Sequence, residues 1–403
     1  MATRVARMAT LGGLPTEVIC MILKHVLPED LENFAGTCRT TASAAQPSLE
    51  VHRDLIRKYA ISRSDEFVEG SIDELVAQVA VDRIGHYVIW LECSDYEYHY
   101  PSYHDEHTLA VLPRFLPNLK TFTLDWPHGI LSHLKAEVAD APHKADPTLT
   151  RLEAIHLRCN GLDGFFGVQV DLVQTFSVLP SVRHLSVIKL KTAPRTHGLI
   201  NPSNSNVITL DLWNCSIDLS DLHEFLQGFM QLQSFSYSMP ALSGSSSDRQ
   251  DTTFITRGLL NSRNTLRKLV VVAPGQRVST IGSLTDFQAL KQLQTHLELL
   301  PSLHLRGNGV PSFQLPDSLQ ILQLQSNTYA ATKYLYVIEL AISRKSSARC
   351  HLRVMMLAFS ANPQYNSKLR MTMKSHEVDE LKARCRSVGI VLSFFDQGWP
   401  TGP

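Results

Sequence analysis

The sequence predicts an α/β fold: a small N-terminal helical domain followed by an irregular solenoid of short parallel strands alternating with helices. Two patterns predict it. Apolar residues recur at helical intervals near the start of the chain, and an L-x-x-L-x-L pattern recurs after residue 115. The length of 403 residues exceeds that of one ordinary core, so two domains or one extended array are expected.

Composition excludes several classes of protein. Hydrophobic residues make up 44% and charged residues 19%, as in a folded soluble protein, and the zero net charge gives no electrostatic argument for nucleic-acid or anionic-membrane binding. No apolar run approaches about 18 residues, so no transmembrane helix is expected. The start MATRVARMAT lacks the apolar stretch of a secretory signal. The seven scattered cysteines contain no CxxC pair, which indicates reduced thiols in the cytoplasm or nucleus.

The first elements are short helices. Pro15 suits a first helical turn, where its missing N–H costs nothing. Apolar residues then follow at helical spacing, at Val18, Ile19, Ile22 and Val26. Pro28 ends this helix and can open a second, whose positive dipole end favours the acidic residues that follow it. The second helix has an apolar stripe of Leu31, Phe34, Ala35 and Cys38. A third short helix, around residues 40–45, is expected to end at Pro47.

Three features of residues 11–47 are shared with a known family: Leu14-Pro15 before Glu17, a Leu-Pro-x-x-Leu turn at 27–31, and Cys38-Arg39. In this order and spacing the segment, about a tenth of the chain, resembles an F-box. Many members carry Trp two residues after the arginine, where this chain has Thr41. From the residues alone, a plain helical hairpin packed on the domain behind it stays an alternative.

The resemblance implies a partner. F-box proteins dock on a Skp-family adaptor, which connects them to a cullin-RING ubiquitin ligase, and the surplus apolar surface of the first helix then becomes an interface. The expected adaptor-binding residues are Leu14, Pro15, Glu17, Val18, Ile19, Ile22, Leu23 and Leu31.

Residues 48–114 are expected to form a helical linker and a first strand. A helix is expected over residues 49–64, and an apolar strand from Tyr87 to Cys93. The order of this helix and strand is similar to the linker of filamentous-fungal F-box proteins, and we interpret it as structural.

Residues 115–395 carry the repeating pattern. Its clearest units are Leu119/Phe122/Leu124, Leu152/Ile155/Leu157, Val182/Leu185/Val187, Val207/Leu210/Leu212, Leu232/Phe235/Tyr237, Leu266/Leu269/Val271 and Leu319/Leu322/Leu324. A weaker unit has Leu290 and Leu293, with Thr295 in the last apolar place. Candidate helices between units include residues 219–229 and 283–293. A strand plus a helix in each unit predicts a curved solenoid.

The pattern resembles a leucine-rich repeat, in which Asn or Cys follows the last leucine by three residues and bonds the turn backbone. Asn160, Cys215 and Asn327 occupy that position here, and other units lack it, so irregular repeats are expected. The competing interpretation is a generic α/β domain with leucine-rich strands. A final helix, which Gly389 can end, and a strand over 390–395 would cap the array, and residues 396–403 form a tail.

No catalytic, cofactor or metal site is expected. The sequence has no GxSxG, HExxH, GxGxxG or Walker loop. Its densest cluster of ligand-type side chains is typical of a solvated polar loop; this cluster comprises Asp95, His99, His104, Asp105, Glu106 and His107. We therefore expect a protein without catalytic residues of its own.

The expected function is substrate recognition in an SCF-type cullin-RING ligase, in the cytoplasm or nucleus, without nucleic acid or membrane. Strand residues between the leucines would hold a protein substrate, with Arg158, Asp211 and Trp213 as the leading candidates. Further candidates are Thr121, Thr123, His156, His184, Ser186, Ser236 and Lys268. The alternative is a non-degradative F-box and repeat scaffold for protein–protein interaction. An enzyme on an α/β fold lacks a catalytic constellation.

Overall fold

A computed structural model of the chain divides into two compact units, Met1–Leu152 and Glu153–Pro403. It describes residues 11–63, 79, 84–94, 112–125, 149, 151–159, 168–191, 205–240, 251–273, 279–300, 314–326, 331–346, 350–359 and 375–395. The predicted tail, Asn160, Asn327 and the ligand-type cluster at 95–107 lie outside these residues.

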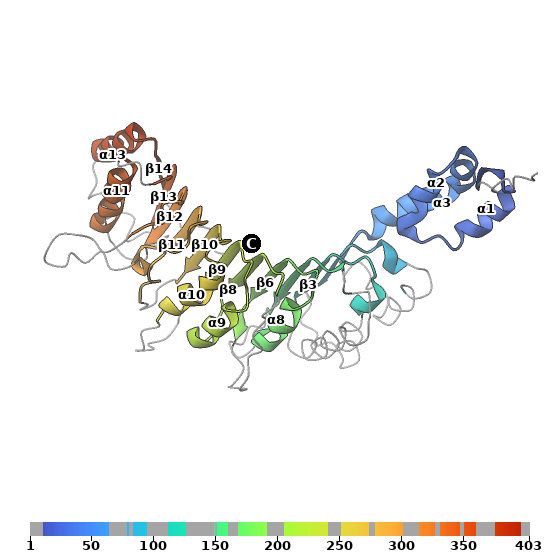
Figure 1. Cartoon of the computed structure of the whole chain (residues 1–403), viewed down its shortest axis with the longest axis horizontal. Helices are drawn as coiled ribbons and strands as arrows, with labels where there is room; N and C mark the ends of the chain where they lie inside the picture. Colours follow the sequence, from blue (N-terminus) through green and yellow to red (C-terminus); the bar gives the residue numbers. More distant parts are fainter. Residues whose placement is uncertain are drawn as a thin grey trace, which may run out of the picture. The chain divides into compact units, whose positions relative to one another are not determined.

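The N-terminal part of the first unit is a bundle of three helices, α1 (Thr16–Leu23), α2 (Leu31–Ala35) and α3 (Arg39–Tyr59) (Figure 1). Short 3-10 turns lie at Leu11–Gly13 and Pro28–Asp30. The first two helices lie where their apolar spacing predicted them. Their buried faces meet α3 in one small core, formed by Ile19, Leu23, Leu31, Ala35, Ala45 and Leu49.

The third helix corrects two expectations, because α3 runs through Pro47 and ends at Tyr59. It does not stop at Pro47, and no separate helix covers 49–64. A proline inside a helix removes one backbone hydrogen bond and costs about 3 kcal/mol. The buried face of α3 spans both sides of the proline, from Ala45 to Leu49, and packing of that face offsets the cost.

The rest of the first unit contains three parallel strands, β1 (Ile61–Arg63), β2 (Trp90–Ser94) and β3 (Thr121–Asp125). β2 pairs with β1 on one side and β3 on the other. β1 occupies residues that were expected to be helical. β2 begins three residues later than predicted, because the backbone over Ile84–Tyr87 forms a 3-10 turn. Another such turn covers Leu112–Phe115.

The second unit is built on parallel strands that follow chain order, with β5 (Val168–Gln169) and β7 (Leu190–Lys191) paired separately. In order, the main strands described in this unit are β4 (Ala154–Arg158), β6 (His184–Ile188), β8 (Thr209–Trp213), β9 (Ser234–Ser238), β10 (Lys268–Val272), β11 (Gln292–His296), β12 (Ile321–Ser326), β13 (Val354–Phe359) and β14 (Val391–Phe395). This unit confirms the prediction of an α/β fold with short parallel strands, and its open, all-parallel sheet is consistent with a solenoid.

The eight L-x-x-L-x-L units all coincide with strands: β3 in the first unit, and β4, β6 and β8 to β12 in the second. Their apolar residues align across neighbouring strands. Leu185 pairs with Leu210, Leu210 with Phe235, and Phe235 with Leu269. Thr295 of the weak unit pairs with Leu324 and is itself buried. The strand β13 was not predicted, although Leu352, Met355 and Leu357 follow the same spacing.

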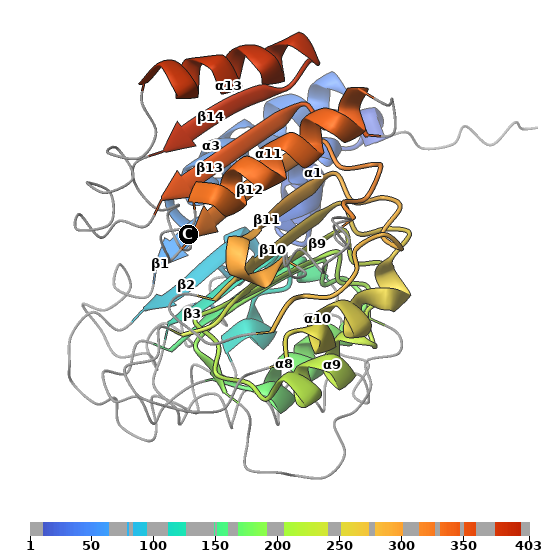
Figure 2. The ribbon, with the colours of Figure 1, turned by 90° about the vertical axis from the view of Figure 1, so that its left-hand side faces the viewer.

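The helices of the second unit are α8 (Val170–Ser177), α9 (Leu219–Leu226), α10 (Thr253–Gly258), α11 (Ala331–Ser346) and α13 (Ser375–Ser387), with 3-10 turns at Leu259–Ser262 and Leu297–Leu299. α8, α9 and α10 lie on one face of the strands (Figure 1). α11 runs beside β12 and β13, and α13 beside β14 (Figure 2). No described helix of this unit covers the other face.

One expected helix, over 283–293, is wrong. The chain there makes successive turns, with Phe287 N–H donating to the Leu284 carbonyl and Leu290 N–H to the Phe287 carbonyl. The apolar residues recur every three positions, so three-residue turns bury all of them. The predicted C-terminal helix and strand are confirmed, and Gly389, at φ +78°, ends α13 in a Schellman motif.

Candidate functional site

The outer face of α1 is an exposed apolar surface of the bundle. Val18 is 39% exposed and Met21, three residues later, is 65% exposed. Pro15 and Glu17 are exposed beside them, and Leu14 and Ile22 are half-buried. We call Pro15, Val18, Met21 and Ile22 the outer face of α1. Met21 was not singled out from the sequence, although its i+3 spacing from Val18 places it there.

Three of the residues predicted to contact the adaptor do not lie on the outer face of α1. Ile19, Leu23 and Leu31 are buried in the core of the bundle. The apolar residues of α1 are thus divided between two faces, one that packs on α2 and α3 and one that is free. These three side chains hold the helix in place rather than offering surface to a partner.

Thr41 has a structural role that its sequence position did not suggest. It is fully buried, and its hydroxyl accepts a hydrogen bond from the Cys38 N–H at 3.1 Å. The same hydroxyl lies 2.8 Å from the Cys38 carbonyl and 3.3 Å from the Ala35 carbonyl. It caps the start of α3 and fixes the turn from α2 into it. A tryptophan could not occupy this space without opening the turn.

A groove of about 400 Å³ lies between the end of α1 and the middle of α3. Its lining includes the apolar residues Val26, Pro28, Val51 and Leu55, together with Tyr87. Val51 is 59% exposed. The groove is a second apolar surface of the bundle. Its exposed residue Val51 serves as the control position when the outer face of α1 is mutated.

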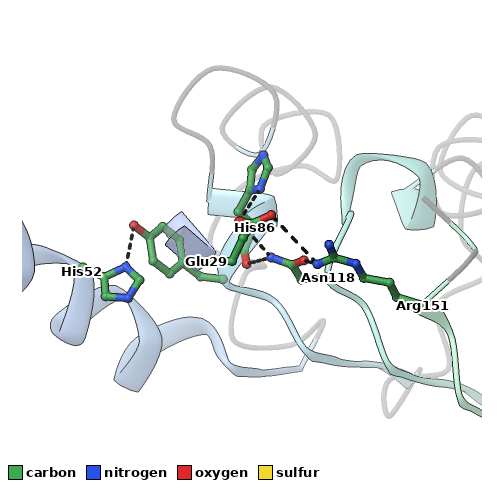
Figure 3. Close-up of polar contacts among 6 residues, drawn as sticks. Glu29, His52, His86, Asn118 and Arg151 are labelled. Atoms are coloured by element: carbon green, nitrogen blue, oxygen red, sulfur yellow. Dashed lines mark hydrogen bonds and ion pairs between the residues drawn. The ribbon is translucent and has the colours of Figure 1, made fainter. Parts of the chain in front are cut away.

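A polar cluster joins the acidic turn of the bundle to the loops before β2 and β3 (Figure 3). Glu29 Oε2 lies 3.3 Å from His86 Nδ1 and accepts from Asn118 Nδ2 at 3.4 Å. Asn118 also donates to the His86 carbonyl at 2.8 Å, and Arg151 pairs with both Asn118 and Glu29. We call Glu29, His86, Asn118 and Arg151 the Glu29 cluster.

The environment of the Glu29 cluster favours a charged carboxylate. Partial burial acts to raise the pKa of Glu29, but hydrogen bonds from its own backbone and from Asn118, together with His86, outweigh burial and lower it below its usual value. Beside it, His52 Nδ1 lies 3.3 Å from the Tyr87 hydroxyl, and burial lowers the pKa of His52. The turn that carries His86 and Tyr87 packs closely on the backbone of Phe115. Only glycine fits at position 85 of this turn, because a Cβ there would lie 2.1 Å from the Phe115 carbonyl oxygen.

The helix-free face of the second unit brings the predicted substrate contacts together. Strand register aligns His156, Ser186 and Asp211 in one row. It aligns Arg158, Ile188 and Trp213 in the next, so the three leading candidates lie on β4 and β8 with only β6 between them. All three are partly exposed. Burial and the charge of Arg158 lower the pKa of His156, against the opposing effect of Asp211.

The other candidates divide by exposure. In the second unit His184 and Lys268 are exposed, whereas Ser186 and Ser236 are buried; in the first unit Thr121 is half-buried and Thr123 is buried. Cys215 is buried in the turn after β8, where its thiol lies 3.3 Å from the Trp213 carbonyl, in accordance with its predicted turn role. Burial raises the pKa of this thiol to about 12, so it is not a nucleophile at neutral pH.

A buried polar cluster at the carboxyl ends of β11, β12 and β13 was not predicted. Ser326 donates to Glu298 Oε1 at 2.5 Å, and Tyr334 donates to the Ala358 carbonyl at 2.9 Å. Burial lowers the pKa of His296 nearby, against the charge of Glu298. These contacts tie neighbouring strand ends to one another. Strand register, not sequence proximity, brings the residues together.

Within the described ranges, no three His, Cys, Asp or Glu side chains are grouped to hold a metal ion. None of the described helices is both long and apolar enough to span a bilayer. No protein-family model matches the chain, and no curated protein matches it.

Proposed function

We propose that the chain is the substrate-recognition subunit of an SCF-type cullin-RING ubiquitin ligase. On this proposal residues 11–47 are an F-box that docks on a Skp-family adaptor, and the parallel array binds a protein substrate. The observation that carries it is the outer face of α1, where Val18 and Met21 stay exposed on a helix whose other face is fully packed. Exposed apolar helix faces are typical of helix-in-groove docking.

We infer further that the array is leucine-rich-repeat-like. Support comes from the alignment of the L-x-x-L-x-L residues across neighbouring strands, and from Cys215 in the turn position that such repeats fill with Asn or Cys. The helix-free face then forms the substrate surface, where Arg158, Asp211 and Trp213 combine two charges and one aromatic ring. Arg and Trp are enriched among residues that dominate protein interfaces. The transfer of ubiquitin belongs to other subunits, and we place the protein in the cytoplasm or nucleus.

The test is co-purification of the full chain with a Skp-family adaptor. The wild-type chain should co-elute with the adaptor in size-exclusion chromatography, and the double variant Val18→Asp with Met21→Asp should lose co-elution. Both side chains are exposed, so the bundle should keep its helical circular dichroism. The matched control is Val51→Asp, which places a charge on an exposed position of α3 and should leave co-elution intact. Equal co-elution of all three chains would refute adaptor docking through α1.

The non-degradative scaffold is the alternative. A scaffold would bind the adaptor in the same way as a substrate-recognition subunit. It differs because an assembled ligase that contains the chain would not ubiquitinate the proteins that the array captures. A reconstituted ubiquitination assay on proteins captured by the array separates the two. Captured proteins that remain unmodified beside a positive-control substrate would favour the scaffold.

A further inference from the structure

A polar pocket of about 400 Å³ lies at the amino ends of strands β9 to β13, away from the helix-free face considered above. Arg267, Lys291 and His351 line it, together with the amides of Gln233, Asn264 and Gln320. We call this the basic pocket. It is open to solvent, because Arg267, Lys291 and His351 are all exposed.

Strand register places two cations of the basic pocket, Arg267 and Lys291, in one row with Arg353, an exposed residue just outside the lining of the pocket. The Lys291 N–H donates to the Arg267 carbonyl, the Gln320 N–H to the Lys291 carbonyl, and the Arg353 N–H to the Gln320 carbonyl, each at 2.8 Å. Parallel neighbours in a sheet are about 4.8 Å apart, so Arg267 and Arg353 are about 14 Å apart across three spacings. The main chain therefore fixes the spacing of the three residues that carry these cations.

The described lining of the basic pocket contains no Asp or Glu to balance these charges. Elsewhere in the same unit, the partly buried Arg344 is paired with Asp317 and the exposed Arg384 with Glu339. Neighbouring cations beside uncharged amides repel one another, and a ligand with several negative groups would relieve that repulsion.

The lining distinguishes between two classes of acidic partner. No Phe, Tyr or Trp is among the described residues of the pocket, so the large aromatic side chains on which single-stranded bases usually stack are missing from its described lining. The side-chain amides can instead bond peptide carbonyl and N–H groups. Acidic side chains two residues apart on an extended peptide are separated by about 6.7 Å, so five residues match the length of the row.

We propose that the basic pocket binds an extended, carboxylate-rich segment of a protein partner. Arg267, Lys291 and Arg353 pair with its acidic side chains, and the amides bond its main chain. In taking that partner to be a substrate, the inference rests on the proposed function.

The experiment measures fluorescence anisotropy of the purified full chain with a labelled ten-residue peptide. The peptide carries Glu at positions 3, 5 and 7 in a Ser/Gly background, and a matched peptide carries Gln at the same positions. We expect saturable binding of the Glu peptide that weakens as NaCl rises from about 50 to about 300 mM, and at least tenfold weaker binding of the Gln peptide.

The variant Arg267→Gln with Lys291→Gln should weaken binding at least tenfold. The control Lys345→Gln with Arg386→Gln removes the same net charge from the last turns of α11 and α13 and should bind like the wild type. Equal loss in both variants, equal binding of the Gln peptide, or displacement of the peptide by a ten-nucleotide single strand at equal concentration would overturn the proposal. Loss of peptide binding with adaptor co-elution intact refutes this inference alone, and the reverse result refutes the adaptor contact alone.

Discussion

The helical bundle and the parallel array bury their apolar residues by different means. The bundle closes over one small core, in which α1 contributes only Ile19 and Leu23, and it leaves Val18 and Met21 exposed. In the second unit the apolar residues of each main strand lie beside those of the next strand in register. They form buried rows such as Leu210, Phe235 and Leu269. The short helix α1 therefore keeps an exposed apolar face, whereas the apolar residues of the strands are covered by neighbouring strands.

The largest effect should come from breaking a row of the array. Phe235→Ala should lower the free energy of unfolding of the second unit by about 3–5 kcal/mol, because the ring is fully buried and a cavity replaces it. Hydrogen exchange of peptides from 205–300 measures the loss. Met230→Ala, at a residue 60% exposed, is the control and should change stability by less than about 0.5 kcal/mol. Comparable losses in both variants would mean that the aligned rows do not carry the stability of the array.

Adjacent positions on α1 test the division of its two faces. Ile19→Ala should destabilise the bundle by about 2–5 kcal/mol, since this side chain is fully buried, while Val18→Ala should change its stability by less than about 0.5 kcal/mol. Urea unfolding followed by helical circular dichroism, with hydrogen exchange in residues 16–59, measures both. If Val18→Ala proved as costly as Ile19→Ala, the outer face of α1 would be a packed face and adaptor docking would lose its surface.

The smallest effect concerns the Glu29 cluster. Glu29→Gln keeps the shape and removes the charge, and should cost about 1 kcal/mol at pH 7, because hydrogen bonds to a carboxylate are stronger than those to an amide. The folded-state pKa of Glu29 is lowered, so its contribution is present above the unfolded pKa and is lost as pH falls through the folded one. The difference in the free energy of unfolding between the wild type and Glu29→Gln should therefore be smaller at about pH 3 than at pH 7, as measured by unfolding at both pH values. A difference that grows on acidification contradicts this.

The parts of the fold that could be predicted are those whose signal is local. Strand alternation has a period of two, and a Leu or Val lies two residues before each strand that carries a unit, so β3, β4, β6 and β8 to β12 could be located one by one. Leu352, Met355 and Leu357 carry the same signal, and β13 was missed only because methionine replaces leucine in its centre. The signal for residues 283–293 was misread, because a three-residue apolar spacing resembles an amphipathic helix over a short window.

The candidate surfaces were predictable only in part. The positions of Arg158, Asp211 and Trp213 between apolar strand residues indicate one face, and the register confirms that they share it. Which residues of α1 stay exposed depends on how α3 packs, and Met21 and Leu23 cannot be assigned to opposite faces from their apolar character. The basic pocket draws single residues from segments up to 118 positions apart, such as Gln233 and His351, and no local motif marks it.

The sequence by itself determined the strand positions, the apolar rows, the C-terminal glycine stop and the apolar surplus of the first helix, because each depends on side chains a few residues apart. Only the tertiary structure decided that α3 continues through Pro47, that Thr41 is a buried cap, and that Arg267, Lys291 and Arg353 form one row. In each case the deciding free energy comes from contacts between segments distant in the chain. Packing on α1 and α2 outweighs the loss of a hydrogen bond at Pro47, and strand pairing sets the spacing of the cations.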